Sequence, residues 1–129
     1  MSVDIKFTPD PNLSKRLEQA AEAGIIAATL AVEAQVVAIC PVSTSRPGHV
    51  GGNLKRSITH KTYTHDGSVK MNTFVGRGDG IVGTNVYYAP YVEYGTSKMR
   101  PRAFLRRGLD IVKPRINDII GAAMKRVLG

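Results

Sequence analysis

A long stretch of helical periodicity constrains this fold more than any other feature of the sequence. Small or apolar residues recur at steps of three and four, which places them on one face of an α-helix. Asp10 and Pro11 make a good helix start, because Asp can accept hydrogen bonds from first-turn amides and Pro tolerates the first position. Pro41 disfavours helical geometry at Cys40 and so ends the stretch. The pattern predicts one continuous helix over residues 11–39. Its stripe consists of Leu13, Leu17, Ala20, Ala21, Gly24, Ile25, Ala28, Val32, Val36 and Ile39.

The period of the sequence changes to two after residue 53. Alternation over residues 54–64, 69–75 and 81–86 predicts three strands. The Asp66-Gly67 pair is a strong signal for a tight hairpin turn between the first two strands, and the glycine-rich stretch 76–80 predicts a second turn. Three consecutive strands joined by two short turns predict an antiparallel meander.

A second helical stripe occupies the last part of the chain. Pro101 is expected to open this helix, and Pro114 predicts a kink or restart near residues 110–114, because an interior proline removes an amide donor and clashes with the preceding turn. The predicted fold class is therefore α+β, with a long N-terminal helix, a three-stranded antiparallel meander and a long C-terminal helix packed against the sheet. The second stripe consists of Leu105, Leu109, Val112, Ile116, Ile119, Ile120, Ala123 and Val127.

The length of 129 residues predicts a single domain over 1–129. Residues 1–10 are expected to form an extended arm, and residues 41–53, which are rich in Gly, Pro and Ser, a flexible loop. No signal peptide and no apolar run of transmembrane length is recognisable, so we expect no membrane partner. The single cysteine, Cys40, excludes an internal disulfide, fits a reducing compartment and is expected to be a small buried residue.

The net charge of +8 is concentrated at one end of the chain. Residues 98–129 hold nine Lys or Arg and two acids, whereas residues 1–97 hold nine Lys or Arg and eight acids. Such a field attracts phosphate backbones or an acidic protein face, but it also fits an ordinary solvated helix face. The candidates for contact with a partner or with nucleic acid are Arg100, Arg102, Arg106, Arg107 and Arg115.

The segment YYAPYVEYGTSKMRPRAFL, residues 87–105, concentrates tyrosines around a single acid. Tyrosine combines a large apolar area with a polar tip and suits interfaces as well as cores. Glu93 precedes five basic residues, so we expect it to pair with an arginine of residues 100–107, within the chain or on a neighbouring subunit. The alternative is that Tyr88, Glu93, Gly95 and Thr96 fix a turn and cap the last helix.

Two motifs in this order resemble a known family. The first is Gly52-Asn53-Leu54-Lys55-Arg56-Ser57-Ile58, and the second runs from Tyr88-Ala89 through Tyr91-Val92-Glu93-Tyr94-Gly95-Thr96 to Pro101 and Phe104-Leu105. They are similar to the signature of the neck, or tail-completion, proteins of long-tailed phages, prophages and gene-transfer particles. The chain departs from that pattern in the loop ending Val50-Gly51-Gly52-Asn53, where the family usually has Thr-Gly, and at Tyr94, where Phe is common.

The resemblance implies a virion component that assembles in the host cytoplasm and carries out no reaction. Its subunits would form a ring of six or twelve copies at the head–tail junction or on top of the tail tube, with DNA passing through the lumen. Its partners would be other copies of itself, neighbouring neck or connector proteins and tail-tube proteins, with non-specific contact to packaged DNA. The residues that the resemblance assigns to the motif or interface are Tyr88, Tyr91, Glu93, Tyr94, Gly95, Thr96, Phe104 and Leu105.

Two other classes of protein compete with this interpretation. The basic C-terminal helix also suits a small nucleic-acid-binding protein, although no recognition motif is present. An enzyme would need clustered carboxylates or a nucleophile beside a base, and the ten acids are scattered. His60 and His65 lack the further ligands at defined spacing that zinc requires, so we expect neither a metal nor a cofactor.

Overall fold

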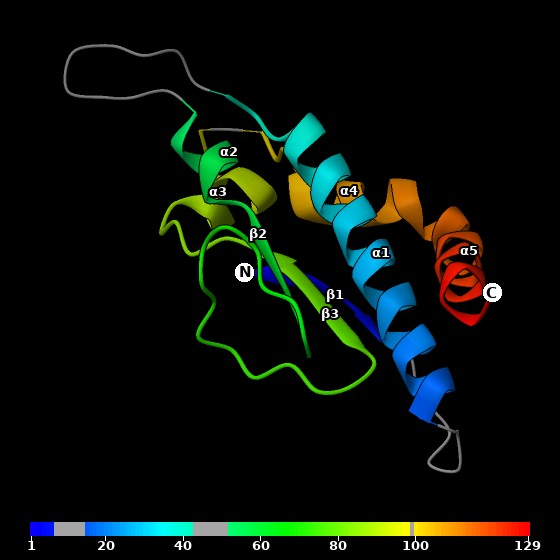
Figure 1. Cartoon of the computed structure of the whole chain (residues 1–129). Coiled ribbons are helices and arrows are strands. Elements are labelled where there is room, and N and C mark those ends of the chain that lie inside the picture. Colours follow the sequence, from blue (N-terminus) through cyan, green and yellow to red (C-terminus); the bar gives the residue numbers. More distant parts are fainter. Residues whose placement is uncertain (7–14, 43–51, 99) are drawn as a thin grey trace.

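The structure is a computed structural model that describes residues 1–6, 15–42, 52–98 and 100–129 (Figure 1). It confirms the predicted class, a mixed α+β fold in which long helices at both ends of the chain flank a three-stranded antiparallel sheet. The elements are, in order, β1 (Ser2–Lys6), α1 (Lys15–Ile39), α2 (Asn53–Ser57), β2 (Thr59–Thr62), β3 (Asp79–Gly83), α3 (Ala89–Tyr94), α4 (Phe104–Val112), the 3-10 turn η1 (Lys113–Arg115) and α5 (Ile116–Leu128).

Helix α1 forms the centre of the fold. It packs against the sheet and against α4 and α5, and α5 runs alongside it (Figure 1). A Cβ on Gly80 of β3 would collide with Thr29, so a glycine at this position allows α1 to lie close to the sheet. The helix ends at Ile39, as predicted, while the proposed start at Asp10-Pro11 lies outside the described residues. The buried residues of α1 are Ala20, Ala21, Gly24, Ile25, Ala28, Thr29, Val32 and Val36.

By length and composition alone, α1 could also cross a membrane, with a mean hydropathy of 1.6 in its most apolar window. No run of this length was expected from the sequence, because Thr29 interrupts the longest apolar stretch. In the structure, however, one face of α1 is packed inside the protein: Ile25, Val32 and Val36 belong to the hydrophobic core. The core therefore accounts for one face of this helix, since 33% of that window is buried.

The strands of the sheet differ from the predicted meander. The order is β1-β3-β2, and β3 pairs antiparallel with both neighbours, Ser2 with Gly83 on one side and Thr59 with Gly83 on the other. The expected extended arm of residues 1–10 thus contributes β1 as an edge strand. The predicted strand over residues 69–75 is wrong. Among residues 69–75 only Val75 is buried. The alternating apolar residues of this stretch therefore form no continuous face against the core.

Two local predictions around β2 were also wrong. Residues 54–57 were expected to begin a strand, but they lie in the short helix α2, which buries Leu54. The hairpin turn was expected at Asp66-Gly67, but it lies earlier in the chain. There the Thr62 amide donates a hydrogen bond to the His65 carbonyl over 2.8 Å. Asp66 and Gly67 lie on the returning segment, and the Gly67 amide donates to the His60 carbonyl over 2.8 Å.

The C-terminal helix is interrupted at the proline that predicted the interruption. Pro114 lies in η1, between α4 and α5, which confirms the expected kink. The helix begins at Phe104 and not at Pro101. Gly108 faces Val36 so closely that a Cβ would collide with the valine side chain, and α4 therefore lies tightly against α1.

The hydrophobic core draws on both ends of the chain, from Ile5 in β1 to Ile120 in α5. The flexible loop expected over residues 41–53 lies largely outside the described residues, and α2 begins at Asn53. The buried core residues are Ile5, Ile25, Ala28, Val32, Val36, Cys40, Leu54, Ile58, Val82, Ala89, Phe104, Leu105, Val112 and Ile120.

Cys40 is part of this core, as its sequence context predicted. Burial raises the pKa of the Cys40 thiol from 9.0 to about 11, and the nearby Lys55 charge lowers it only in part. At neutral pH we therefore expect a covered, neutral thiol that reacts with an aromatic disulfide reagent far more slowly in the native protein than in denaturant. Equal rates in both conditions would contradict the burial.

Because the thiolate is the disfavoured form in the folded protein, the contribution of the Cys40 thiol to stability is complete below pH 9.0 and is lost as the pH rises towards about 11.

Candidate interaction site

The tyrosine-rich segment folds into α3, the connection 95–103 and the start of α4. The connection is held to α3 by one backbone bond, in which the Arg102 amide donates to the Val92 carbonyl over 2.8 Å. This bond brings the end of α3 next to the first turn of α4. The residues that the resemblance assigned to one motif consequently come together in space, but they do so in two groups with different surroundings.

Glu93 belongs to the buried group and caps the beginning of α4. Its side chain is 3% exposed, its Oε2 accepts a hydrogen bond from the Leu105 amide over 3.0 Å, and its Oε1 accepts one from the Arg106 amide over 3.1 Å. These amides belong to the first turn of α4, where no carbonyl of the helix can reach them. A carboxylate at this position is also stabilised by the positive end of the helix dipole.

This arrangement corrects the expected pairing of Glu93 with an arginine of residues 100–107. In the part of the chain that the structure describes, the carboxylate bonds to the backbone of that segment, and no guanidinium forms an ion pair with it. The reason is geometric, because α4 begins at Phe104 and presents its free amides directly to α3. The alternative reading of a turn that caps the last helix describes Glu93 better.

Other motif residues support the same cap. Phe104 and Leu105 follow it directly and lie in the core, each with 1% of its surface exposed. Gly95 ends α3 at φ 78°, a left-handed conformation that favours glycine. The Thr96 hydroxyl accepts a bond from the Lys98 amide over 3.2 Å and so shapes the start of the connection.

The second group consists of tyrosines that face solvent. Tyr87, Tyr91 and Tyr94 are 85%, 56% and 63% exposed, while Tyr88 is half-buried and packs against the core. Tyr91 and Tyr94 are three residues apart on α3, which makes them neighbours on the helix surface, and Tyr87 lies in the turn that precedes the helix. We call these three residues the tyrosine face. Exposed aromatic side chains grouped in this way are typical of protein interfaces.

Four of the five candidate basic residues lie at the start of α4, which is joined to α3 by the Arg102 backbone bond and the Glu93 cap. Arg100 and Arg102 precede α4, and Arg106 and Arg107 lie in its first turn, whereas Arg115 lies in η1 at the other end of α4, about 12 Å away along the helix axis. All five are exposed. Among the described residues, the ion pairs involve Lys6, His60 and Arg77, and none involves a cation of residues 98–129. The charge at this end is therefore not neutralised within the described chain.

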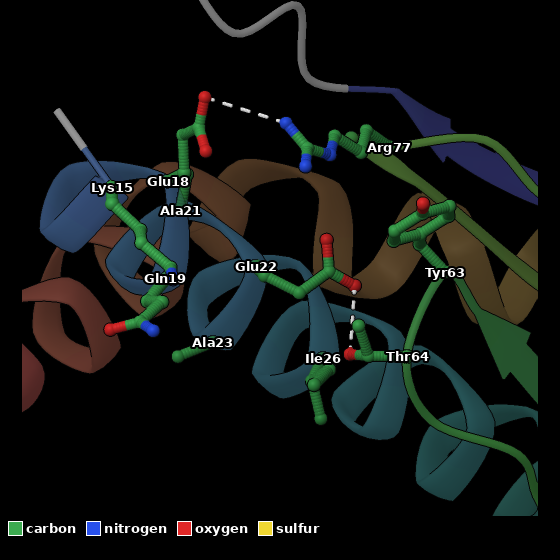
Figure 2. Close-up of a pocket in the computed structure, with 11 residues that line it drawn as sticks. Lys15, Glu18, Gln19, Ala21, Glu22, Ala23, Ile26, Tyr63, Thr64 and Arg77 are labelled. Atoms are coloured by element: carbon green, nitrogen blue, oxygen red, sulfur yellow. Dashed lines mark hydrogen bonds and ion pairs between the residues drawn. The ribbon is translucent and has the colours of Figure 1, made fainter. Parts of the chain in front are cut away.

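A groove lies at the other end of the sheet, beside the first turns of α1 (Figure 2). It has a volume of about 380 Å³ and is mainly apolar. Arg77 forms one rim, with its Nη1 3.4 Å from Glu18 Oε1 and its guanidinium 5.8 Å from the centre of the Tyr63 ring. We call it the α1 groove; its lining residues are Lys15, Glu18, Gln19, Ala21, Glu22, Ala23, Ile26, Tyr63, Thr64, Arg77 and Gly78.

Sequence reasoning missed this groove. Its walls come from three segments, the beginning of α1, the end of β2 and the turn before β3, which lie up to 63 positions apart along the chain. The local signal at Arg77 pointed only to a glycine-rich turn, and Gly78 does adopt the left-handed conformation of such a turn, with φ 82°. No periodicity shows which side chains such segments bring together.

A third cluster connects α1 to β2. The Nδ1 of His60 contacts the Glu33 carboxylate, and the Nε2 of His60 lies 2.8 Å from Nδ1 of His65. The planes of the two rings are within 9° of parallel. Rings stacked face to face keep their atoms about 3.5 Å apart, whereas these two nitrogens are 2.8 Å apart. The rings therefore meet edge to edge through a hydrogen bond. The buried His60 is therefore satisfied on both nitrogens.

The histidine cluster offers no metal site in the part of the chain described. No group of three or more His, Cys, Asp or Glu side chains is arranged there to hold an ion. In the tautomer of neutral His60 that donates from Nδ1 to the Glu33 carboxylate, Nε2 of His60 accepts a hydrogen bond from Nδ1 of His65. This chain of bonds connects the middle of α1 to β2 and to the segment after β2.

Comparison of this chain with protein-family models, with curated proteins and with solved structures finds no match.

Proposed function

We propose that this chain is a structural subunit of a ring at the head–tail junction, or at the top of the tail, of a long-tailed phage or a related particle, and that it acts by assembly without catalysis. Two motifs with the spacing of the neck-protein signature suggest this assignment. The observation that carries it is the tyrosine face, three exposed aromatic side chains on α3 and in the turn just before it. Aromatic side chains supply much of the binding energy at protein interfaces.

The buried part of the motif gives the exposed part a fixed position. The Glu93 bonds to Leu105 and Arg106 join the end of α3 to the first turn of α4, and Phe104 anchors that turn in the core. A rigid platform reduces the ordering cost of binding, because the tyrosines need not be immobilised from a flexible loop. The motif therefore combines a structural half with an interface half.

The exposed cations at the start of α4, which take part in none of the ion pairs of the described residues, support contact with an acidic neighbour or with DNA in a lumen. In the proposed ring of six or twelve copies, these residues would face the packaged DNA, an adjoining neck or connector ring, or the tail tube. Contact with DNA would be non-specific, since a basic surface recognises backbone phosphates without reading sequence.

The proposal predicts that Tyr91→Ala combined with Tyr94→Ala dissociates the assembly and leaves the fold intact. Each truncation at an interface centre typically costs about 2 kcal/mol, so we expect the dissociation constant to rise by roughly 100-fold or more. Light scattering coupled to gel filtration and negative-stain images, at concentrations from micromolar to millimolar, measure this. Phe74→Ala, which removes a ring that is 86% exposed, is the matched control and should leave the assembly unchanged.

The same samples test the competing function of a small nucleic-acid-binding protein. That function is favoured by the exposed Arg100, Arg102, Arg106 and Arg107, and it predicts a monomer or dimer that binds duplex DNA in a strongly salt-dependent manner. A wild-type protein that stays monomeric at every concentration and binds DNA would replace the ring proposal. A ring that ignores tyrosine truncation would remove the tyrosine face from it.

A further inference from the structure

Helix α5 has two sides with different chemistry. Its inner side packs against α1, where a Cβ on Gly24 would collide with Ile120 (Figure 1). Val127 is 40% exposed but follows Ile120 and Ala123 on this inner side. The residues of the opposite side are all exposed, and none of them is aromatic or large and apolar. We call this side, with the arginine directly before the helix, the α5 outer face; it consists of Arg115, Asn117, Asp118, Gly121, Ala122, Lys125 and Arg126.

The α5 outer face is positively charged. It holds three cations and one carboxylate, Asp118, and none of these four side chains takes part in the ion pairs of the described residues. A fourth cation comes from α1, because the exposed Arg16 donates from Nη2 to the Leu128 carbonyl over 2.7 Å. This bond satisfies a carbonyl of the last helical turn, which no amide of the helix can reach. It also places Arg16 at the same end of α5 as Lys125 and Arg126.

The composition of this face favours a polyanion over a protein as its partner. Protein interfaces have a core of apolar and aromatic side chains, and the α5 outer face contains neither. A nucleic-acid backbone is bound through its charge, so it needs cations on an unobstructed surface. The middle of α5 provides that surface, because Gly121 and Ala122 carry no long side chain, and a Cβ on Gly121 would have no neighbour within 4 Å.

The cations lie at the two ends of α5. Arg115 and Arg126 are eleven positions apart, which corresponds to about 16 Å along a helix axis. The major groove of duplex DNA is about 12 Å wide. The two ends of α5 can therefore reach phosphates of both strands that border the groove, with the small residues of the helix between them.

We propose that the α5 outer face binds the phosphate backbone of a double-stranded nucleic acid, with Arg115 at one end and Arg16, Lys125 and Arg126 at the other. The contact is independent of sequence, since phosphates carry no sequence information. This inference specifies the DNA-facing surface of the proposed ring and leaves the cations at the start of α4 for a protein neighbour. It does not require the ring, so the two proposals can fail separately.

The test compares two pairs of substitutions that remove the same charge from the full chain. Lys125→Gln with Arg126→Gln changes the α5 outer face, and Arg106→Gln with Arg107→Gln changes the start of α4; all four side chains are exposed. Each phosphate contact steepens the dependence of log affinity on log salt concentration by about 0.9. We expect the α5 pair to reduce this slope by about 1.8 and the affinity at least about tenfold, and the α4 pair to leave the slope unchanged. Fluorescence anisotropy with a duplex of about 30 base pairs, between about 50 and 200 mM salt, measures both quantities.

An additional variant gives a result that a folding defect cannot produce. Asp118→Asn removes the carboxylate of the α5 outer face, and we expect the duplex to bind severalfold more tightly because a charge that repels phosphates is lost. Asp110→Asn makes the same change on α4 and should have a smaller effect. Equal gains from both variants would show that net charge alone governs binding, and would contradict the inference.

The inference is also wrong if the wild type does not bind the duplex at about 50 mM salt, or if the slope falls with the α4 pair and not with the α5 pair. Displacement of the duplex by polyglutamate at equal charge concentration would assign the face to an acidic protein instead. Light scattering on the same samples reports assembly separately. Rings that bind DNA unchanged after the α5 substitutions would leave the proposed function standing without this contact. A monomer that loses DNA binding with the α5 pair would support this contact and contradict the ring.

Discussion

Replacing Phe104 by alanine is expected to lower the free energy of unfolding by about 4 kcal/mol. Phe104 is 1% exposed and is among the largest side chains enclosed in the core, in the first turn of α4. Its removal leaves a cavity that the neighbouring helix backbone can only partly close. Since domains of this size are stable by roughly 5–15 kcal/mol, a change of this magnitude is a large fraction of the total. Chemical denaturation followed by circular dichroism measures it.

The matched control for Phe104 is another phenylalanine with the opposite exposure. Phe74→Ala removes the same atoms from a position that is 86% exposed, and we expect a change within about 0.5 kcal/mol. Similar losses from both substitutions would contradict the placement of Phe104 in the core. Because Phe104 is buried, it can contribute to assembly only by holding α4 in place. The difference between the two substitutions therefore shows whether Phe104 and Leu105 act by stabilising the fold.

Replacing Glu93 by glutamine is expected to lower the free energy of unfolding by about 2 kcal/mol. The amide keeps one oxygen acceptor, but its NH₂ group faces a backbone donor at Leu105 or Arg106, and the charge that favours the helix N-terminus is lost. If Glu93 instead paired with an arginine of a neighbouring subunit, the same substitution would leave the fold intact and weaken the oligomer. The structure predicts a loss of stability first. Urea denaturation of the isolated chain measures the difference.

Asp110→Asn is the matched control for Glu93. It makes the same carboxylate-to-amide change on α4, at an exposed position that takes part in none of the ion pairs of the described residues. We expect a change within about 0.5 kcal/mol. If Glu93→Gln unfolds no more easily than Asp110→Asn, while the assembly dissociates, then Glu93 belongs to the interface and its role as a cap is wrong.

These two predictions divide the motif by physical role. Glu93, Phe104 and Leu105 are buried, and their substitution should appear as lost stability, whereas Tyr91 and Tyr94 are exposed, and their substitution should appear as lost assembly. The buried residues of segment 87–105 are therefore expected to stabilise the fold, and its exposed tyrosines to bind a partner. Measuring stability and oligomer size on the same variants separates them.

The sequence by itself determined the two long helices of this protein, while the short helices α2 and α3 were not predicted. The stripe that ends at Ile39 and the interruption at Pro114 depend on contacts within three or four residues, so their signals are local. The α+β class followed from the same patterns. The burial of Cys40 was also predictable, because a free cysteine usually packs as a small apolar residue.

Only the tertiary structure decided which strands pair, what Glu93 binds and where the groove lies. Strand pairing selects among distant partners, and the N-terminal segment joined β3 where the alternating residues 69–75 did not. The cations beside Glu93 in sequence suggested an ion pair, but the start of α4 placed two amides closer. The α1 groove joins residues from α1, the end of β2 and the turn before β3. Such contacts depend on which distant segments pack together, and the local periodicity of the sequence does not indicate this.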